Sequence, residues 1–492
     1  MFPTPSEPDF PYLVLQRDDW NDYSYYTFFE AFLILTSQVT GRVKLGGVRV
    51  MRKGQAKGET TFPKDVGGPI DSEELVGNYC SLSGQKKYYI FLQELGDLSL
   101  ARRVLSALQD ASWLPEVRRS FQAEPCFKIS LLRESSDRMM LDEAGLMFGG
   151  TNQMIDKFVV EIKLQGASGP HVFDFDFDSA QSPLSKRVHA LVGLNGVGKT
   201  QVLARLAMLM SRFSQQAEKE RTSVLDREDI LDPVPSIYNV VAISFSAFDE
   251  FDRPTEKQGE RFSYSYCGLR TQRGKLRTEE ELLAEIKDLI STRMDDEQRE
   301  ILVTVLDSIV RVEDIHAFVF QVEAHAQIYG RLSAGQRITL NCLCHLLSKI
   351  RPRTLVLFDE PELHLHPQLL ANLMSALADI LERFESFAIV ATHSPIVIQE
   401  LPRTCVHVVR RERMMPVVYH PTFETFGENL SEITRNVFVA TDSDRDYRAV
   451  LQRLLQQSDN QIEIVSEMFQ GKLGLNAMIF LQSLVDNASE SQ

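Results

Sequence analysis

The residues with the clearest chemistry lie in one segment, Gly193-Leu-Asn-Gly-Val-Gly-Lys-Thr200. It matches the pattern G-x-x-x-x-G-K-[ST] at every fixed position and directly follows an apolar stretch. Glycines let such a backbone curl so that its N–H groups face phosphate oxygens, and the following helix adds its positive N-terminal end. A lysine at this place reaches the β- and γ-phosphates, and a threonine hydroxyl binds Mg²⁺. The segment therefore predicts an ATP site with Mg²⁺, formed by Asn195, Gly196, Val197, Gly198, Lys199 and Thr200.

Two carboxylates follow a second apolar stretch, residues 354–358. A carboxylate at the tip of a buried parallel strand can hold the Mg²⁺ shell, which suits Asp359, and Glu360 is then placed to polarise the attacking water. His393 follows a third apolar stretch, where a neutral imidazole can hydrogen-bond the γ-phosphate. We predict Asp359 as a metal residue and Glu360 and His393 as catalytic. The acids could instead cap the helix starting near Pro367, and a lone histidine at a strand end is usually structural.

The segment Leu332-Ser-Ala-Gly-Gln336 would by itself predict only a helix N-cap. Along the chain, however, this segment follows the phosphate loop and is followed by the acidic strand and the histidine. Because of this order, residues 155–410 resemble the ABC ATPase superfamily, whose signature is LSGGQ-like. The resemblance implies that this signature clamps the γ-phosphate of ATP held by another chain. Two ATP molecules would then lie between two head-to-tail chains with two-fold symmetry, in a homodimer that could build a higher oligomer. The residues carried over to this trans role are Ser333, Ala334, Gly335 and Gln336.

The chain departs from the superfamily pattern at two places. Family members carry a glutamine after the strand expected at 239–245, where this sequence has Ser244-Phe-Ser-Ala-Phe-Asp249. Either Ser246 or Asp249 takes over the metal-side role, or hydrolysis is slow. Residues 362–367, Glu-Leu-His-Leu-His-Pro, resemble the loop of RecF- and OLD-type ATPases rather than that of transporter ATPases. His364 and His366 there predict a dimer contact more than a metal pair.

The elements that must position these residues alternate along the chain. Segments typical of strands lie at 158–164, 172–177, 188–192, 239–245, 354–358 and 387–392, with helical patterns between them. This alternation predicts an α/β fold with a mostly parallel, covered sheet, and the resemblance makes it an ABC-type P-loop NTPase domain. The alternating phenylalanines at 173, 175 and 177 predict a core strand more than an adenine-stacking platform.

Three parts are expected along the chain. Residues 1–150 predict an N-terminal α+β accessory domain, and residues 155–410 the ATPase domain with a helical subdomain at about 250–335. Residues 411–492 predict a mostly helical C-terminal extension. Fewer than a hundred residues separate the strand at 239–245 from the signature, which leaves no room for the long helical arms of an SMC-type protein.

Composition limits the binding partners, the cysteine chemistry and the cellular location that we expect for this protein. The formal net charge of −15 disfavours the whole surface as a non-specific nucleic-acid binder, although a local basic patch for DNA stays possible. The six scattered cysteines predict reduced, buried thiols, and the pair Cys342 and Cys344 with His345 predicts core packing rather than zinc. The sequence has no run of eighteen apolar residues and no signal-peptide pattern, so we expect a soluble, cytoplasmic protein without a membrane contact.

Among ABC ATPases, the layout resembles the ATPase subunits of bacterial anti-phage systems, in particular the PtuA-like proteins of Septu, which act with an HNH nuclease. The tail segment 422–438 shares this likeness. The resemblance implies an ATP-dependent dimer that regulates an HNH nuclease subunit encoded nearby. A PARIS-like ATPase with a Toprim partner and a RecF-like DNA repair ATPase are the alternatives, and a transporter motor subunit fits less well.

The chain could also carry a nuclease itself. Asp442-Ser-Asp444 resembles the Asp-x-Asp pair of Toprim domains. Only about fifty residues follow this pair, too few to complete such a domain. Asp442 and Asp444 therefore predict the start of a helix at 447–455, where acids are favourable.

Overall fold

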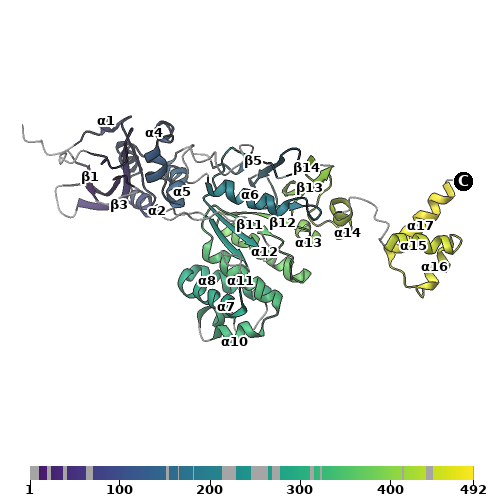
Figure 1. Cartoon of the computed structure of the whole chain (residues 1–492). Coiled ribbons are helices and arrows are strands. Elements are labelled where there is room, and N and C mark those ends of the chain that lie inside the picture. Colours follow the sequence, from purple (N-terminus) through teal and green to yellow (C-terminus); the bar gives the residue numbers. More distant parts are fainter. Residues whose placement is uncertain are drawn as a thin grey trace, which may run out of the picture. The chain divides into compact units, whose positions relative to one another are not determined.

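The chain forms two compact units, residues 1–433 and 434–492 (Figure 1). This computed structural model describes residues 10–18, 24–36, 41–62, 70–150, 154–164, 166–180, 182–212, 229–244, 264–268, 277–310, 315–321, 324–412, 415–438 and 447–490. No described helix is long and apolar enough to cross a membrane.

A seven-stranded sheet organises the first unit. Its strand order is β10-β9-β11-β12-β7-β13-β14, and every neighbouring pair is parallel except β13 and β14. This arrangement confirms the predicted α/β fold with a central parallel sheet. The strands are β7 (Val188–Val192), β9 (Asn239–Ser244), β10 (Tyr264–Gly268), β11 (Thr354–Asp359), β12 (Phe387–Thr392), β13 (Val406–Glu412) and β14 (Met415–Tyr419).

The β13–β14 hairpin extends this sheet beyond residue 410, where the sequence placed the end of the ATPase domain. The central strands β7, β11 and β12 are buried at every residue, as expected for parallel strands covered on both faces.

A three-stranded antiparallel sheet shares the core of this domain. Its order is β6-β5-β8, from β5 (Lys157–Ile162), β6 (His171–Asp176) and β8 (Ile230–Asp232). On β6 the phenylalanines point inward and Asp174 points outward, so the strand buries one face. Phe173, Phe175 and Phe177 are buried in the core and contact one another and buried histidines. Their burial excludes the adenine-stacking alternative.

Helices cover the sheet, and a helical subdomain lies between β10 and β11 in the sequence. α6 (Lys199–Arg212) begins inside the phosphate loop and buries Val202, Leu206 and Leu209 against the sheet. α11 (Ala334–Lys349), α12 (Pro367–Arg383) and α13 (Pro395–Gln399) follow the signature, the acidic strand and the histidine. The subdomain contains α7 (Glu279–Asp288), a π-helical turn at Leu289–Arg293, α8 (Asp296–Val310), α9 (Ile315–Phe320) and α10 (Ala324–Arg331).

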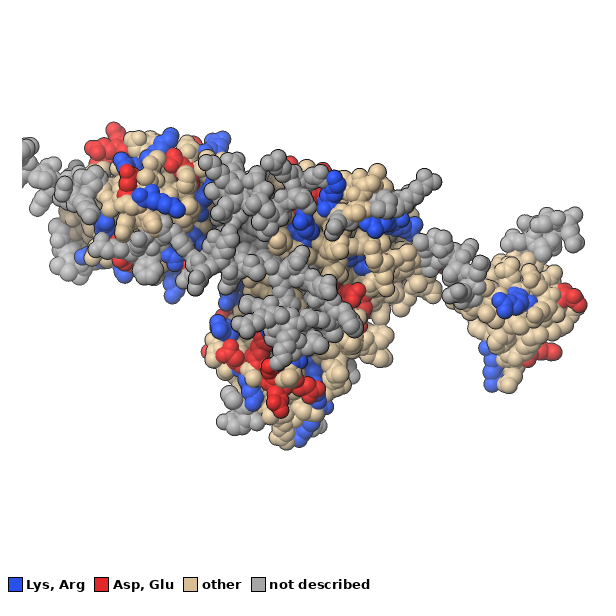
Figure 2. All heavy atoms as spheres, in the orientation of Figure 1, with Lys and Arg blue, Asp and Glu red and all other residues tan. Residues whose placement is uncertain are grey.

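Charge is mixed on the face shown in Figure 2. Lysines and arginines lie scattered among neutral and acidic side chains. Acidic side chains gather over the helical subdomain, where α7 begins with Glu279, Glu280 and Glu281 (Figure 2). Acids in the first turn of a helix are stabilising, because they face its positive end.

The N-terminal part is a four-stranded antiparallel sheet packed with helices. The strands are β1 (Tyr12–Arg17), β2 (Phe28–Ile34), β3 (Arg42–Arg52) and β4 (Tyr79–Leu82), in that order. An amphipathic stretch forms two helices, α2 (Lys86–Glu94) and α3 (Leu98–Ala107), because Gly96 adopts φ +72° and Asp97 caps the second. The remaining helices are α1 (Ser72–Leu75), α4 (Pro115–Phe121), α5 (Ser135–Glu143), a π-helical turn at Phe127–Leu131 and a 3₁₀ turn at Ala144–Phe148.

The N-terminal part contacts the ATPase sheet directly. The Tyr238 hydroxyl donates to Asp142 at 2.8 Å, just before β9 begins. Arg353, just before β11, donates to the carbonyl of Ser236 at 2.7 Å and pairs with Asp156. These buried and half-buried bonds hold the entrances of β9 and β11 together.

The second unit is helical. It contains α15 (Tyr447–Gln457), α16 (Ile462–Met468) and α17 (Leu475–Glu490), packed around Leu451, Leu455, Val465 and Leu481. α15 begins where the sequence placed it; Asp442 and Asp444 lie outside the described residues. A short helix α14 (Leu430–Ile433) ends the first unit, and a π-helical turn at Thr434–Phe438 starts the second.

All six cysteines are free and buried. Cys342 and Cys344 lie inside α11, and burial raises the pKa of both thiols. Buried, protonated thiols behave as small apolar side chains, so the predicted core packing is confirmed for this pair.

Candidate ATP site

The strand order brings the predicted residues to one edge of the sheet. β12 lies between β7 and β11, so the residues that follow these three parallel strands emerge side by side. The phosphate loop follows β7, the acids end and follow β11, and His393 follows β12. The histidine therefore stands between the loop and the acids, although it is 194 residues from Lys199 in sequence.

The backbone of the phosphate loop requires its glycines. Gly196 and Gly198 have φ of +80° and +100°, which L side chains rarely adopt. Gly193 has φ +154°, and an added Cβ would lie 2.2 Å from the carbonyl oxygen of Val409 on β13. Nothing lies within 4 Å of an added Cβ at Gly196. The loop is therefore pressed against β13 at its start and open at its middle, the shape of a cradle for phosphates.

Lys199 is the buried cation of this edge. Its Nζ donates to the carbonyls of Gly193 and Leu194 at 3.0 and 3.2 Å and lies 3.3 Å from Nδ1 of His393. Burial lowers the pKa of Lys199 to about 8, although the nearby carboxylates oppose this shift. A bound phosphate would stabilise the charged form of the Lys199 ammonium, because it supplies a partner of opposite charge.

The side chains of Thr200 and Asp359 lie next to each other, as two residues that hold one Mg²⁺ ion would. The Thr200 hydroxyl is 2.9 and 3.1 Å from the two oxygens of the Asp359 carboxylate, which is almost fully buried at the end of β11. A hydroxyl and a carboxylate oxygen are ligands that Mg²⁺ accepts, together with waters and substrate phosphates. The two side chains fit the ion and would hold it beside the phosphate cradle.

Glu360 and His393 form a hydrogen-bonded pair. His393 Nε2 is 3.0 Å from the Glu360 carboxylate, which can only accept, so Nε2 carries the proton. The other ring nitrogen, Nδ1, lies 3.3 Å from the Lys199 ammonium and 3.2 Å from the carbonyl oxygen of Gly193. Glu360 has φ +47°, and its N–H donates to the carbonyl of Ala391 on β12 at 2.8 Å. The unusual backbone conformation points to a position under functional constraint.

Glu362 is a residue of this site that the motifs alone did not assign. Its carboxylate accepts from the Thr392 hydroxyl at 2.8 Å and from the His393 N–H at 2.5 Å. The Thr392 hydroxyl in turn accepts from the N–H of Ser394. Glu362 therefore fixes the turn that presents His393. The second acid of Asp-Glu-Pro-Glu was the available sequence signal.

The signature residues lie at the start of α11. Ser333 caps this helix and exchanges hydrogen bonds with Gln336, so the bland capping role is also present. Ser333 and Ala334 are exposed. An added Cβ on Gly335 would lie 3.0 Å from the carbonyl oxygen of His364, which places the helix start against the loop after the acids. The first turn of this sixteen-residue helix therefore offers N–H groups at a surface.

Two further pairs of residues were singled out in the sequence. Ser246 and Asp249, the candidates for the missing glutamine, lie outside the described residues. His366 caps α12 through the Gln368 N–H, and His364 is exposed with φ +66°. Among the described residues, neither belongs to a group of three or more potential metal ligands, and the dimer contact of this loop stays a prediction.

Together, the parallel sheet and the glycine-rich loop between β7 and α6 give the chain the fold of an ABC-type P-loop domain. Residues 323–399 match the family model described as "AAA domain, putative AbiEii toxin, Type IV TA system". The matched segment contains the signature, Asp359, Glu360 and His393.

The chain is similar over nearly its whole length to Protein ea59 of Escherichia phage lambda. The two are 27% identical over 516 residues, which cover 97% of this chain and 95% of ea59. Among solved structures, cbiO1 of Clostridium perfringens, part of the ABC transporter complex cbiONQ, matches with 13% identity and a TM-score of 0.32. That match covers 65% of this chain and all of cbiO1. An SMC head bound to the C-winged helix domain of ScpA matches with 14% identity and a TM-score of 0.26, covering 55% and 98%.

Proposed function

We propose that this chain is an ATP-dependent switch in which two copies close around two Mg-ATP molecules. The observation that carries the proposal is the bonded series Lys199, His393 and Glu360 beside Thr200 and Asp359. These groups can bind a triphosphate and its metal and can orient a water. The exposed start of α11 supplies the complementary donors from the second chain.

Hydrolysis is assigned to Glu360. Its carboxylate would accept the proton of a water that attacks the γ-phosphate, while Lys199 and the Mg²⁺ held by Thr200 and Asp359 offset the developing charge. The His393 N–H holds Glu360 in place at 3.0 Å. Turnover is slow in this proposal, because the superfamily glutamine is missing from 239–249.

The output of the switch is control of an associated nuclease in anti-phage defence. The support is the resemblance of the motif order, the 362–367 loop and residues 422–438 to the PtuA-like ATPases that act with HNH nucleases. DNA would be contacted through that complex, because this chain carries a net charge of −15 and mixed charge on the face in Figure 2. A PARIS-like arrangement with a Toprim partner, or a RecF-like repair role, would use the same ATP switch.

The dimer is tested with Glu360→Gln. We expect this variant to bind Mg-ATP and to sediment as a dimer, because ATP is trapped when the base is neutralised. Turnover should fall by about 10²- to 10⁴-fold. The wild-type chain without nucleotide and Glu360→Gln with Mg-ADP are the controls. A monomer in all three conditions by analytical ultracentrifugation would refute the dimer.

The trans clamp is tested by mixing two inactive chains. In a heterodimer of Lys199→Ala and Ser333→Ala, one composite site carries both lesions and the other carries none. Turnover should therefore reappear on mixing at a fraction of the wild-type rate. A signature that acts on its own chain's ATP predicts no recovery at any mixing ratio.

The nuclease output is tested by co-expressing the chain with the product of the neighbouring open reading frame. Cleavage of DNA that depends on the nucleotide state, and that changes in Glu360→Gln, supports the proposal. An HNH sequence next door favours the PtuA-like arrangement and a Toprim sequence the PARIS-like one. A membrane permease there would overturn both.

A further inference from the structure

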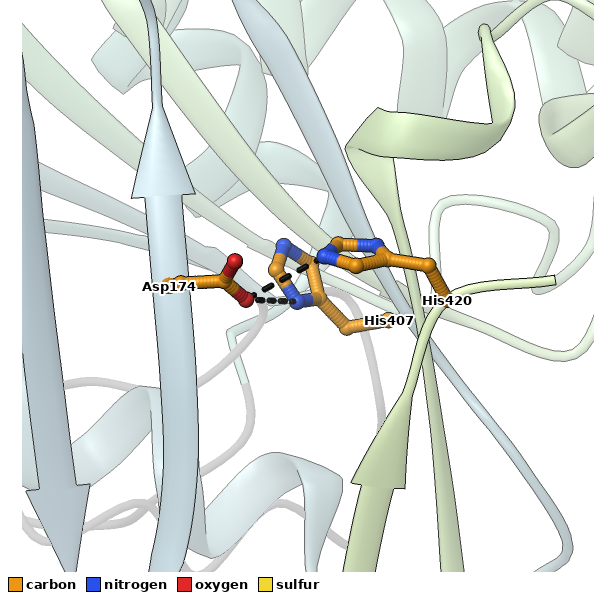
Figure 3. A group of neighbouring side chains, drawn as sticks. All are labelled: Asp174, His407 and His420. Atoms are coloured by element: carbon orange, nitrogen blue, oxygen red, sulfur yellow. Dashed lines mark hydrogen bonds and ion pairs between the residues drawn. The ribbon is translucent and has the colours of Figure 1, made fainter.

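Three side chains from distant segments meet away from the ATP site. Asp174 points outward from β6, His407 lies on β13, and His420 follows the end of β14 (Figure 3). Asp174 Oδ1 lies 3.1 Å from His420 Nε2 and 4.0 Å from His407 Nδ1. One ligand atom from each of the three residues lies within 4.8 Å of the others. In the part of the chain that the structure describes, this is the group with such an arrangement.

A chain of hydrogen bonds fixes the orientation of the His407 lone pair. His189 Nε2 lies 3.2 Å from the carbonyl of Asp176, which can only accept, so this nitrogen carries the proton. In the neutral ring of this buried histidine, Nδ1 is then bare. His407 Nε2, 3.0 Å from that Nδ1, must therefore be the donor. The remaining nitrogen, His407 Nδ1, is then a lone pair directed toward Asp174 and His420.

This lone pair lacks a donor. His407 is fully buried, and its Nδ1 has no hydrogen-bond partner among the described residues. An unsatisfied buried acceptor destabilises a folded protein, because the atom has lost its hydrogen bonds to water. A group that fills the space with positive charge would remove this penalty.

His420 is oriented in the same way. Its Nδ1 donates to the carbonyl of Val406 at 2.9 Å, because a carbonyl can only accept. Its Nε2 is therefore bare in the neutral ring and faces the Asp174 carboxylate. Such backbone and imidazole contacts behind a ring are the usual supports of metal-binding histidines, since they fix the tautomer.

We propose that Asp174, His407 and His420 bind a divalent transition-metal ion, for which Zn²⁺ is the best fit. Two imidazoles and one carboxylate are ligands that zinc prefers, at about 2.0–2.2 Å. A tetrahedral ion with such bonds separates its ligand atoms by roughly 3.3 Å, and the separations of 3.1 and 4.0 Å lie on either side of that value. Side-chain rotation of Asp174, which is 67% exposed, can adjust the longer one. Water completes the coordination from the exposed side.

The ion would act as a clamp between two sheets. Asp174 belongs to the antiparallel sheet, while His407 and His420 belong to the β13–β14 hairpin of the central sheet. β13 also pairs with β7 and presents the Val409 carbonyl against Gly193 of the phosphate loop. Metal binding would therefore stiffen the support of the loop from behind. This inference does not depend on the proposed nuclease or dimer.

The competing arrangement is an ion pair without a metal. If His420 is protonated, its Nε2–H donates to Asp174, and the His407 lone pair is left unsatisfied. The two arrangements differ in whether a metal binds and in which residues abolish binding.

The test titrates Zn²⁺ into the full chain after treatment with a chelator, in excess Mg²⁺ and without nucleotide, by calorimetry. One equivalent should bind, and Asp174→Asn and His420→Gln should each weaken binding by at least about 100-fold. Both side chains are partly exposed, so these variants should fold. Asp178→Asn and His316→Gln, at exposed positions outside the cluster, are the matched controls and should bind as the wild type does.

Two further readouts separate the outcomes. Co²⁺ should give the visible bands of a tetrahedral site without a thiolate charge-transfer band, because no cysteine belongs to the cluster. Zn²⁺ should raise the Tm of the wild type and of both controls, but not of Asp174→Asn or His420→Gln. Absence of a bound equivalent, or equal affinity in all five proteins, would overturn the proposal. A thiolate band that persists in both ligand variants would also do so.

Discussion

The sheet edge that carries the candidate ATP site (the ATP edge) and the Asp174–His407–His420 cluster both involve β13, yet they are encoded in opposite ways. At the ATP edge, each group follows its own strand in a short motif, and the parallel sheet merely aligns the motifs. In the cluster, three single residues contribute one atom each, and Asp174 and His420 are 246 residues apart. Function that lies in contiguous motifs is visible in a single sequence. Function that depends on which strands become neighbours is visible only in the fold.

The two regions also differ in how they treat buried polar atoms. Lys199, the buried cation of the ATP edge, has two carbonyls and an imidazole around it. His407 Nδ1, the buried atom of the cluster, has no donor among the described residues. The ATP edge therefore gives its buried cation hydrogen-bond partners from the protein. The cluster leaves one buried acceptor without a donor among the described residues.

The largest effect is expected from a substitution at the ATP edge. Lys199→Ala removes the one cation within the phosphate loop, and we expect ATP affinity to fall by roughly 1,000-fold, about 4 kcal/mol. Calorimetry with ATP in excess Mg²⁺ measures this, with Lys157→Ala, an exposed lysine on β5, as the matched control. Equal ATP affinity in the two variants would mean that the loop is not the nucleotide site.

A buried acid that is surrounded by hydrogen-bond donors sharpens the contrast with His407. Asp110 is buried and accepts from Ser112, Trp113 and Tyr89, and burial raises its pKa from 3.8 to about 6 despite those bonds. Between these pH values the folded state holds the proton more tightly than the unfolded chain. The free energy of unfolding should therefore fall by about 2 kcal/mol as pH rises from 4 to 6.

Asp110→Asn should remove this contribution to the pH dependence. Urea unfolding of both proteins at several pH values measures it, with Asp97→Asn, an exposed helix cap, as the control. Parallel pH profiles for the wild type and Asp110→Asn would show that the buried carboxyl does not carry the proton.

The smallest effect tests the contact between the two regions. Gly193→Ala places a Cβ 2.2 Å from the Val409 carbonyl, whereas Gly196→Ala meets nothing within 4 Å although its φ is also positive. We expect Gly193→Ala to lower the free energy of unfolding by about 2 kcal/mol more than Gly196→Ala does. Thermal or urea unfolding compares them. If the two changes were equally destabilising, β13 would not press on the phosphate loop.

Sequence alone predicted the parallel sheet, the phosphate loop and the buried Phe173–Phe177 alternation, because each depends on a local period or spacing. It did not predict that the sheet continues through β14, since Met415–Tyr419 has no strong strand pattern and is held by pairing with β13.

The candidate site shows the same division. The residue types of Lys199, Asp359 and Glu360 followed from the motif, but the contact of His393 with both Lys199 and Glu360 needed the position of β12 between β7 and β11. Glu362 escaped assignment because its partners, Thr392 and the His393 N–H, belong to another strand. The positions of Ser246 and Asp249 relative to this edge depend on residues outside the described ranges.

The close approach of Gly335 to the His364 carbonyl has a further consequence in the proposed dimer. The helix that holds the partner's nucleotide packs against the loop that follows the same chain's Glu360, because a Cβ added at Gly335 would lie 3.0 Å from the His364 carbonyl oxygen. Release of phosphate from one pocket would then pull on the opposite pocket through this rigid contact. Turnover should therefore depend sigmoidally on ATP concentration, because the two active sites would act cooperatively rather than independently.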